Sequence, residues 1–133
     1  MSLLYNKMKR YNPLNPGDEP KWYPVLKSTE SVGEKEVGQL IADETTLNEK
    51  EAEMALHQLM KILIRLLLSG KTVKLSGVGS FRLTVNSEGS ATEEEANANK
   101  IKKVNLRFTP SETMRDALKK ATFIDASTLL NKK

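Results

Sequence analysis

The sequence predicts an α+β fold in which two helices precede a glycine-rich β-hairpin and a third helix follows it. Residues 54–68 are apolar on nearly every helical face, which predicts a helix whose last two turns are buried on all sides. The next stretch, G-K-T-V-K-L-S-G-V-G-S-F at Gly70–Phe81, ends that helix with a glycine cap and then alternates like a strand around two more glycines. The block T-P-S-E at Thr109–Glu112 is typical of a helix start.

The composition is that of one modest domain without disulfides. The chain has 133 residues, of which 38% are apolar, and it carries a net charge of +4. It contains no cysteine, which excludes a disulfide framework and thiolate metal sites and favours a reducing compartment. The longest apolar run, Ile62–Leu68, is too short to span a bilayer, and Met1–Pro16 lacks the apolar core of a signal peptide. We therefore expect a cytoplasmic protein with no membrane partner, and its charge permits binding to a polyanion without proving it.

Residues 1–33 are predicted to form an N-terminal extension built as a β-hairpin. Leu3–Tyr11 reads as a strand, a loop with three prolines follows, and Trp22–Lys27 alternates and can pair back on the first strand. The first strand carries three neighbouring cations, Lys7, Lys9 and Arg10. They either solubilise an edge strand or make additional contacts to a ligand, and the sequence leaves both interpretations open.

Two capping signals predict the helical pair. Ser31 and Glu34 have the spacing of a capping box and open a short helix that ends near Thr45. Asn48 and Glu51 repeat the signal and open the long apolar helix. The short connection between the helices predicts an antiparallel pair.

An arm over residues 84–107 is predicted beyond the glycines. Phe81–Val85 and Ile101–Phe108 read as strands, and Ser87–Asn99 between them has no apolar residue larger than alanine. Such a segment cannot pack into a core, so the arm should protrude.

The third helix is expected to start at Thr109, with the proline in its first turn and its end near Ala121. Thr122–Ile124 is then a candidate short strand.

This order of elements resembles that of the bacterial histone-like proteins, HU and integration host factor. The resemblance rests on V-K-L-S-G-V-G-S-F at Val73–Phe81 and on R-F-T-P-S-E-T-M-R-D-A-L at Arg107–Leu118, and it covers about Glu34–Lys120. The extension, with its K-W-Y, resembles the longer HU-like proteins of the Bacteroides group. The expected organisation is an extension at 1–33, an HU-like domain at 34–121 and a tail at 122–133.

The resemblance implies an intertwined dimer, either a homodimer or a heterodimer. The sequence supports a dimer independently, because the long helix and the glycine hairpin carry more apolar surface than one small core can cover. A monomer whose N-terminal hairpin covers this patch is the alternative. The expected interface residues are Leu59, Leu63, Leu66, Val78, Phe81 and Phe108.

The resemblance also implies an architectural role, in which double-stranded DNA is bound through phosphates and the minor groove with little sequence preference, in the nucleoid. The arm departs from the family pattern, since Thr92–Ala96 contains three glutamates and no proline where the family has a basic tip with an intercalating proline. The arm base is therefore expected to carry the contacts, with less DNA bending. The candidate DNA-binding residues are Lys74, Arg82, Lys100, Lys102, Lys103 and Arg107. A dimeric adaptor that binds protein through the extension or the acidic arm is the alternative function.

The residue pattern gives no support to an enzyme. The one histidine, His57, lies in the middle of a helix, and there is neither a histidine pair nor a phosphate-binding glycine loop. The adjacent Glu93, Glu94 and Glu95 lie on a flexible loop and lack the preorganisation of a metal site. We expect no cofactor, no metal and no small-molecule substrate.

Overall fold

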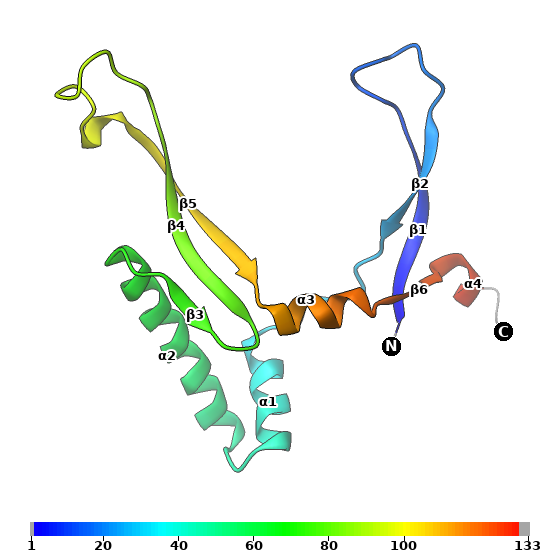
Figure 1. Cartoon of the computed structure of the whole chain (residues 1–133). Helices are drawn as coiled ribbons and strands as arrows, with labels where there is room; N and C mark the ends of the chain where they lie inside the picture. Colours follow the sequence, from blue (N-terminus) through cyan, green and yellow to red (C-terminus); the bar gives the residue numbers. More distant parts are fainter. Residues whose placement is uncertain (1, 131–133) are drawn as a thin grey trace. The chain divides into compact units, whose positions relative to one another are not determined.

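Contacts within the chain divide it into two units in the computed structural model, which describes residues 2–130. One, the terminal unit, joins the two ends of the chain and comprises Met1–Ser31 and Ala117–Lys133. The other, the central unit, is Val32–Asp116. Figure 1 shows the elements of each. The fold is mixed α+β with two small sheets, as the sequence predicts.

The terminal unit is built on a three-stranded sheet. β1 (Ser2–Arg10) pairs with β2 (Lys21–Leu26) in the antiparallel hairpin that alternation predicts. β6 (Thr122–Asp125) pairs with β1 in parallel on its other side, which gives the order β2-β1-β6. The short helix α4 (Ala126–Leu130) follows β6, and Ala126 is buried. The extension and the tail, which the sequence suggested as separate segments, thus share one sheet.

Polar contacts fasten β6 to β1. The hydroxyls of Ser2 and Thr122 form a hydrogen bond of 2.8 Å, and Lys7 Nζ lies 3.7 Å from a carboxylate oxygen of Asp125. Asp125 also accepts hydrogen bonds from the hydroxyl and the backbone N–H of Ser127, at 2.8 and 3.0 Å. These bonds, with a smaller contribution from Lys7, hold the pKa of Asp125 below its ordinary value.

The central unit begins with two antiparallel helices, α1 (Glu34–Glu44) and α2 (Glu49–Leu68). Asn48 caps α2 as predicted: its side chain accepts a bond of 2.8 Å from the Glu51 N–H and donates one of 2.6 Å to the Glu51 carboxylate. The helices approach closely at Gly38, where an added Cβ would lie 3.3 Å from the backbone nitrogen of Glu53. Small residues at this crossing therefore set the distance between the helices.

The capping box predicted for α1 is wrong. Gly33 occupies the N-cap position and no side chain accepts a cap hydrogen bond there. Glu34 instead places its carboxylate 2.9 Å from Nε2 of His57 on α2. The Glu34 carboxylate therefore contacts the neighbouring helix instead of capping its own.

The second sheet has the order β3-β4-β5, with β3 at Val73–Leu75, β4 at Gly79–Ser87 and β5 at Ile101–Pro110. Gly70, with φ of 82°, ends α2 and lets the chain turn into β3. Both neighbouring pairs of strands are antiparallel, and a 3-10 turn at Ala98–Lys100 precedes β5. Figure 1 shows the β4–β5 ribbon extending beyond β3 and the two helices, as expected of an arm.

The start of α3 (Glu112–Lys119) also differs from the sequence prediction. Thr109 and Pro110 belong to β5, and Ser111 is the residue whose hydroxyl accepts a 3.0 Å bond from the Met114 N–H. The Ser111 N–H in turn donates to the carbonyl of Val78, at 3.0 Å. Pairing with β4 extends the strand through the proline, so the cap moves two residues along the chain.

Two glycines of the β3–β4 turn are needed for different reasons, and this gives a first prediction. Gly77 has φ of +84° with open space around it, whereas a Cβ at Gly79, φ +155°, would collide with the Thr109 carbonyl oxygen. We expect Gly77→Ala to lower the free energy of unfolding by about 1–2 kcal/mol, through backbone strain alone. Gly79→Ala should cost clearly more, because β5 must move away. Urea unfolding of both variants measures the difference, and equal losses would contradict the steric account.

Few apolar residues are buried in the central unit. Of its residues, all of which the structure describes, only Ala52 and Leu67 are buried apolar side chains. Leu68 is 75% exposed and Ile64 is 53% exposed, so the last turns of α2 are not buried on all sides by the chain itself. Gln58, Lys61 and Arg65 form one polar stripe along α2, and the exposed Met54 lies in line with it one turn earlier. A single copy of the central unit therefore leaves most of α2 uncovered.

Candidate nucleic-acid interface

The register of the second sheet sorts its side chains onto two faces. Arg82 lies opposite Arg107, Asn86 opposite Lys103, and Lys74 opposite Ser80. Because side chains alternate along a strand and cross-strand partners share a face, these residues lie on one side of the sheet. We call this side the basic face, and its members are Lys74, Ser80, Arg82, Thr84, Asn86, Lys103, Asn105, Arg107 and Thr109.

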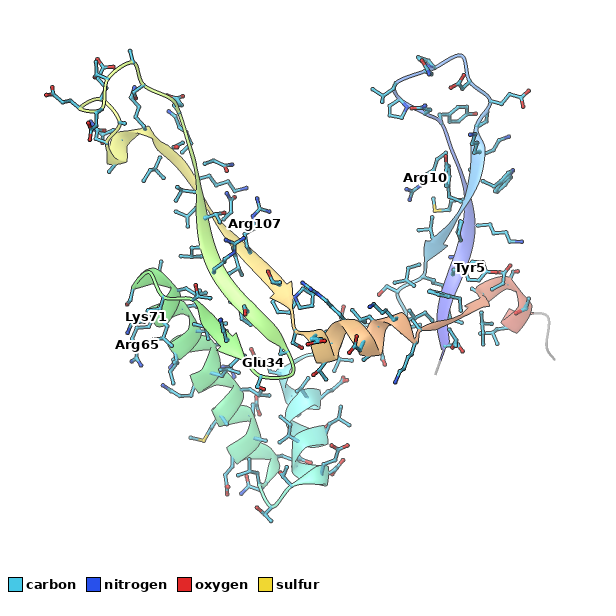
Figure 2. All side chains as sticks on the ribbon, viewed as in Figure 1. Tyr5, Arg10, Glu34, Arg65, Lys71 and Arg107 are labelled. Atoms are coloured by element: carbon cyan, nitrogen blue, oxygen red, sulfur yellow. The ribbon has the colours of Figure 1, made fainter. Side chains whose placement is uncertain are left out.

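Two like charges face each other in the middle of the basic face. Arg82 and Arg107 are direct cross-strand partners, and both side chains are exposed. Figure 2 shows Arg107 on the arm. No ion pair to either guanidinium occurs among the described residues. Like charges placed opposite each other destabilise a sheet, and an anion bound between them removes that penalty.

Uncharged polar residues fill the space between the cations. The Asn105 amide donates a 3.0 Å hydrogen bond to the side-chain oxygen of Asn86, and Thr84 lies opposite Asn105. Such groups donate to phosphate oxygens and sugars as readily as to one another. The DNA-binding residues predicted from the sequence were cations alone and did not include these polar residues, although period-two alternation from Arg82 and Arg107 identifies them.

The structure separates two of the six predicted DNA-binding residues from the others. Lys74, Arg82, Lys103 and Arg107 share the basic face. Lys102 lies at the bulge in β5, with its Nζ 3.3 Å from a carboxylate oxygen of Glu88. Lys100 ends the 3-10 turn and is half-buried.

The arm tip is held by short-range bonds and is acidic. The Thr92 hydroxyl accepts a bond of 3.4 Å from the Glu95 N–H, and the Ala96 N–H donates to the carbonyl of Glu93 at 3.1 Å. Glu93, Glu94 and Glu95 are all exposed. Among residues 2–130, no group of three or more histidines, cysteines or acids could hold a metal ion.

The opposite side of the sheet is apolar and largely uncovered. The rings of Phe81 and Phe108 contact each other across the strands, with centroids 4.9 Å apart and planes tilted by 41°. Farther along the arm, Val104 is 55% exposed and Leu106 is 57% exposed. We call this side the apolar face, and its members are Val73, Leu75, Phe81, Leu83, Val85, Val104, Leu106 and Phe108.

The predicted dimer-interface residues divide by exposure. Leu59, Val78 and Phe108 are 40–45% exposed. Leu63, Leu66 and Phe81 are half-buried.

The three cations of β1 do not form one patch. Lys7 and Lys9 point to one face of the terminal sheet, while Arg10 points to the other, because side chains alternate along the strand. Figure 2 shows Arg10 on the hairpin. No described helix is long and apolar enough to cross a membrane.

Comparison with known proteins decides the family. A family model described as an HU domain fused to wHTH, Ig, or Glycine-rich motif, HU-HIG, matches residues 1–125. The chain belongs to the HU-HIG family. The match includes the first 33 residues, so the extension is part of the HU-HIG pattern. No curated protein sequence matches this HU-HIG chain.

Two solved structures share the fold. A candidate DNA-binding protein from Bacteroides vulgatus ATCC 8482 superposes with a TM-score of 0.66 at 12% identity, over 94% of this chain and 48% of that one. HU of Anabaena, crystallised with DNA, superposes with a TM-score of 0.52 at 18% identity, over 65% of this chain and 97% of that one. The HU-HIG chain thus spans about half of the Bacteroides protein. Its family and fold are those of an HU domain rather than of an enzyme class.

Proposed function

We propose that this HU-HIG domain binds duplex DNA as a dimer, through phosphate and minor-groove contacts and with little sequence preference, and that it helps to organise the nucleoid. The observation that carries the proposal is the exposed pair Arg82 and Arg107, directly opposite on the arm and without an anionic partner among the described residues. A polyanion relieves their repulsion, and the long ribbon lets the contact follow a DNA backbone. Family membership supports the same assignment.

A dimer is the second part of the proposal. Both the apolar face and the end of α2 are exposed in one chain, with Leu68 at 75% and Leu106 at 57%. At roughly 25 cal/mol per Å² of apolar area, covering several such side chains contributes several kcal/mol. Pairing two copies covers them and leaves each basic face open to DNA.

The salt dependence of binding tests the proposal. If the four basic-face cations of each protomer each neutralise one phosphate, a dimer makes about eight contacts, and log affinity should fall with log salt at a slope of about −7. Titration of two unrelated duplexes at two or more salt concentrations, with anisotropy detection, measures both the salt dependence of the affinity and the preference for one DNA sequence over the other. A slope near zero, or tight binding to only one duplex, would contradict the proposal and favour the protein-binding adaptor.

The acidic tip limits what the arm can do to DNA. It contains no proline, and its glutamates would repel the phosphates that a tip must approach to wedge between bases. We therefore assign the contacts to the basic face and expect the DNA to bend less than with a relative that inserts a wedge.

A further inference from the structure

The terminal sheet presents a second surface that DNA binding by the arm does not use. The strand register shows which residues share one side of this sheet: Tyr5 pairs with Leu26, Lys9 with Trp22, and Leu3 with Phe123. We call this side the aromatic face, and its members are Leu3, Tyr5, Lys7, Lys9, Trp22, Pro24, Leu26, Phe123 and Asp125. Figure 2 shows Tyr5 on β1, the central strand of the sheet.

The aromatic face contains an open hollow of about 620 Å³. Tyr5, Trp22 and Phe123 of the aromatic face line it, together with Tyr23, the neighbour of Trp22 on β2. Trp22 is 66% exposed and Phe123 is 62% exposed, which is far more than packing of such rings in a core allows. Large aromatic side chains that are left open in one hollow indicate a ligand with flat apolar surfaces.

The charge around the hollow is positive. Lys9 Nζ lies 5.9 Å from the centre of the Trp22 ring, within the range of a cation–π contact. Lys7 stands between Tyr5 and Lys9 on the same side of β1 and lines the hollow. Asp125 on this side lies 3.7 Å from Lys7 and accepts two bonds from Ser127, so it offsets one of the two lysines and the net charge of the face stays positive.

We propose that the aromatic face binds a single strand of nucleic acid, with bases stacked on its rings and phosphates beside Lys7 and Lys9. Tyr5 and Trp22 are separated by four residues of β1, or about 13 Å, because Trp22 pairs with Lys9. That spacing leaves room for more than one base. An unpaired strand offers both the flat apolar surface and the negative charge that this face complements, whereas a duplex hides the faces of its bases.

This site is separate from the arm and goes beyond the proposed duplex binding. The aromatic face and the basic face belong to different sheets, and neither shares a residue with the other. The two activities can therefore be lost independently, by substitutions in one sheet or the other.

The single tryptophan of the chain makes the site directly observable. Trp22 is the one Trp in the sequence, so its intrinsic fluorescence reports on the aromatic face alone. Titration of the full chain with an oligothymidylate should quench this fluorescence, since a base stacks on the ring. An unchanged signal at oligonucleotide concentrations that saturate an anisotropy assay would overturn the proposal.

Matched variants then test the geometry with labelled oligothymidylate. Trp22→Ala and Phe123→Ala should each weaken binding about tenfold or more, because each removes one stacking surface. Tyr11→Ala removes a ring that is 71% exposed and lies outside the hollow, so it should leave binding unchanged. Lys9→Gln should weaken binding and Arg10→Gln should not, although the two residues are neighbours in sequence, because they lie on opposite faces.

Duplex binding measured on the same variants separates this site from the arm. Trp22→Ala should keep duplex affinity within about twofold of the unmodified chain, and Arg82→Glu should keep the quench by oligothymidylate. Loss of duplex affinity in Trp22→Ala would contradict a separate site for single strands. A change of Trp22 emission with protein concentration and without nucleic acid, together with no quench, would identify the face as a contact between copies and overturn the proposal.

Discussion

Leu66→Asp is expected to unfold the chain rather than to release a folded monomer. Leu66 is half-buried on α2, next to residues that remain exposed in a single copy, and we place it in the dimer interface. An aspartate there must either stay charged in an apolar contact or keep the two copies apart with α2 uncovered. In either case the free energy of unfolding should fall by more than about 3 kcal/mol, which is a large part of the stability of a small domain.

The control for this variant is Met54→Asp on the same helix. Met54 is 70% exposed and lies in line with the polar stripe of Gln58 and Lys61, so the same change in charge should cost little there. Thermal unfolding by circular dichroism and sedimentation velocity of both variants decide the question. If Leu66→Asp sediments as a monomer with native helicity, folding does not require pairing and the expected unfolding is wrong. If the unmodified chain is monomeric at micromolar concentration, the proposed dimer is wrong.

Arg82→Glu is expected to weaken DNA binding strongly while it leaves the fold unharmed or slightly more stable. The substitution replaces a like-charge pair by an opposite-charge pair with Arg107, which should stabilise the folded sheet by about 0.2–1 kcal/mol. It also removes one phosphate contact per protomer and adds a repulsive charge in its place. We expect affinity for duplex DNA at physiological salt to fall at least tenfold, and the salt slope to become shallower by about 2 per dimer.

Two comparisons make this test specific. Lys61→Glu changes the net charge equally but lies on α2, so any loss that it causes measures the effect of net charge alone. Replacing Glu93, Glu94 and Glu95 by Gln at the arm tip should leave affinity unchanged or raise it modestly. A loss of stability in Arg82→Glu equal to its loss of binding would show that Arg82 supports the fold instead. Weaker binding after the tip substitutions would indicate that the tip, rather than the basic face, makes the contacts to DNA.

Local signals in the sequence predicted most of the elements. Asn48 and Glu51 lie within one turn of each other, so their mutual bonds form as soon as the helix does. Gly70, Gly77 and Gly79 all have positive φ, which the spacing around the turn indicated. The start of α2 and the glycine turns on either side of β3 therefore followed from interactions over a few residues.

Interactions between distant residues explain what the sequence could not show. The carboxylate of Glu34 was assigned to its own helix start, but it binds His57 on the next helix. β5 continues through Pro110 because β4 pairs with it, and the cap of α3 moves to Ser111. The candidate site could not be predicted in full without the strand register. Only the pairing shows that Arg82 lies opposite Arg107 and that Lys9 and Arg10 lie on opposite faces of their sheet.

The pairing of β6 with β1 determines when the terminal sheet can exist during synthesis. Ser2 and Thr122 are 120 residues apart, so at roughly 5–20 residues per second on the ribosome β1 waits on the order of 10 s for its partner. Until then it can form only a two-stranded hairpin, which is marginally stable in water by itself. β1 is thus made well before β6 but reaches its final pairing only after the whole central unit has been synthesised.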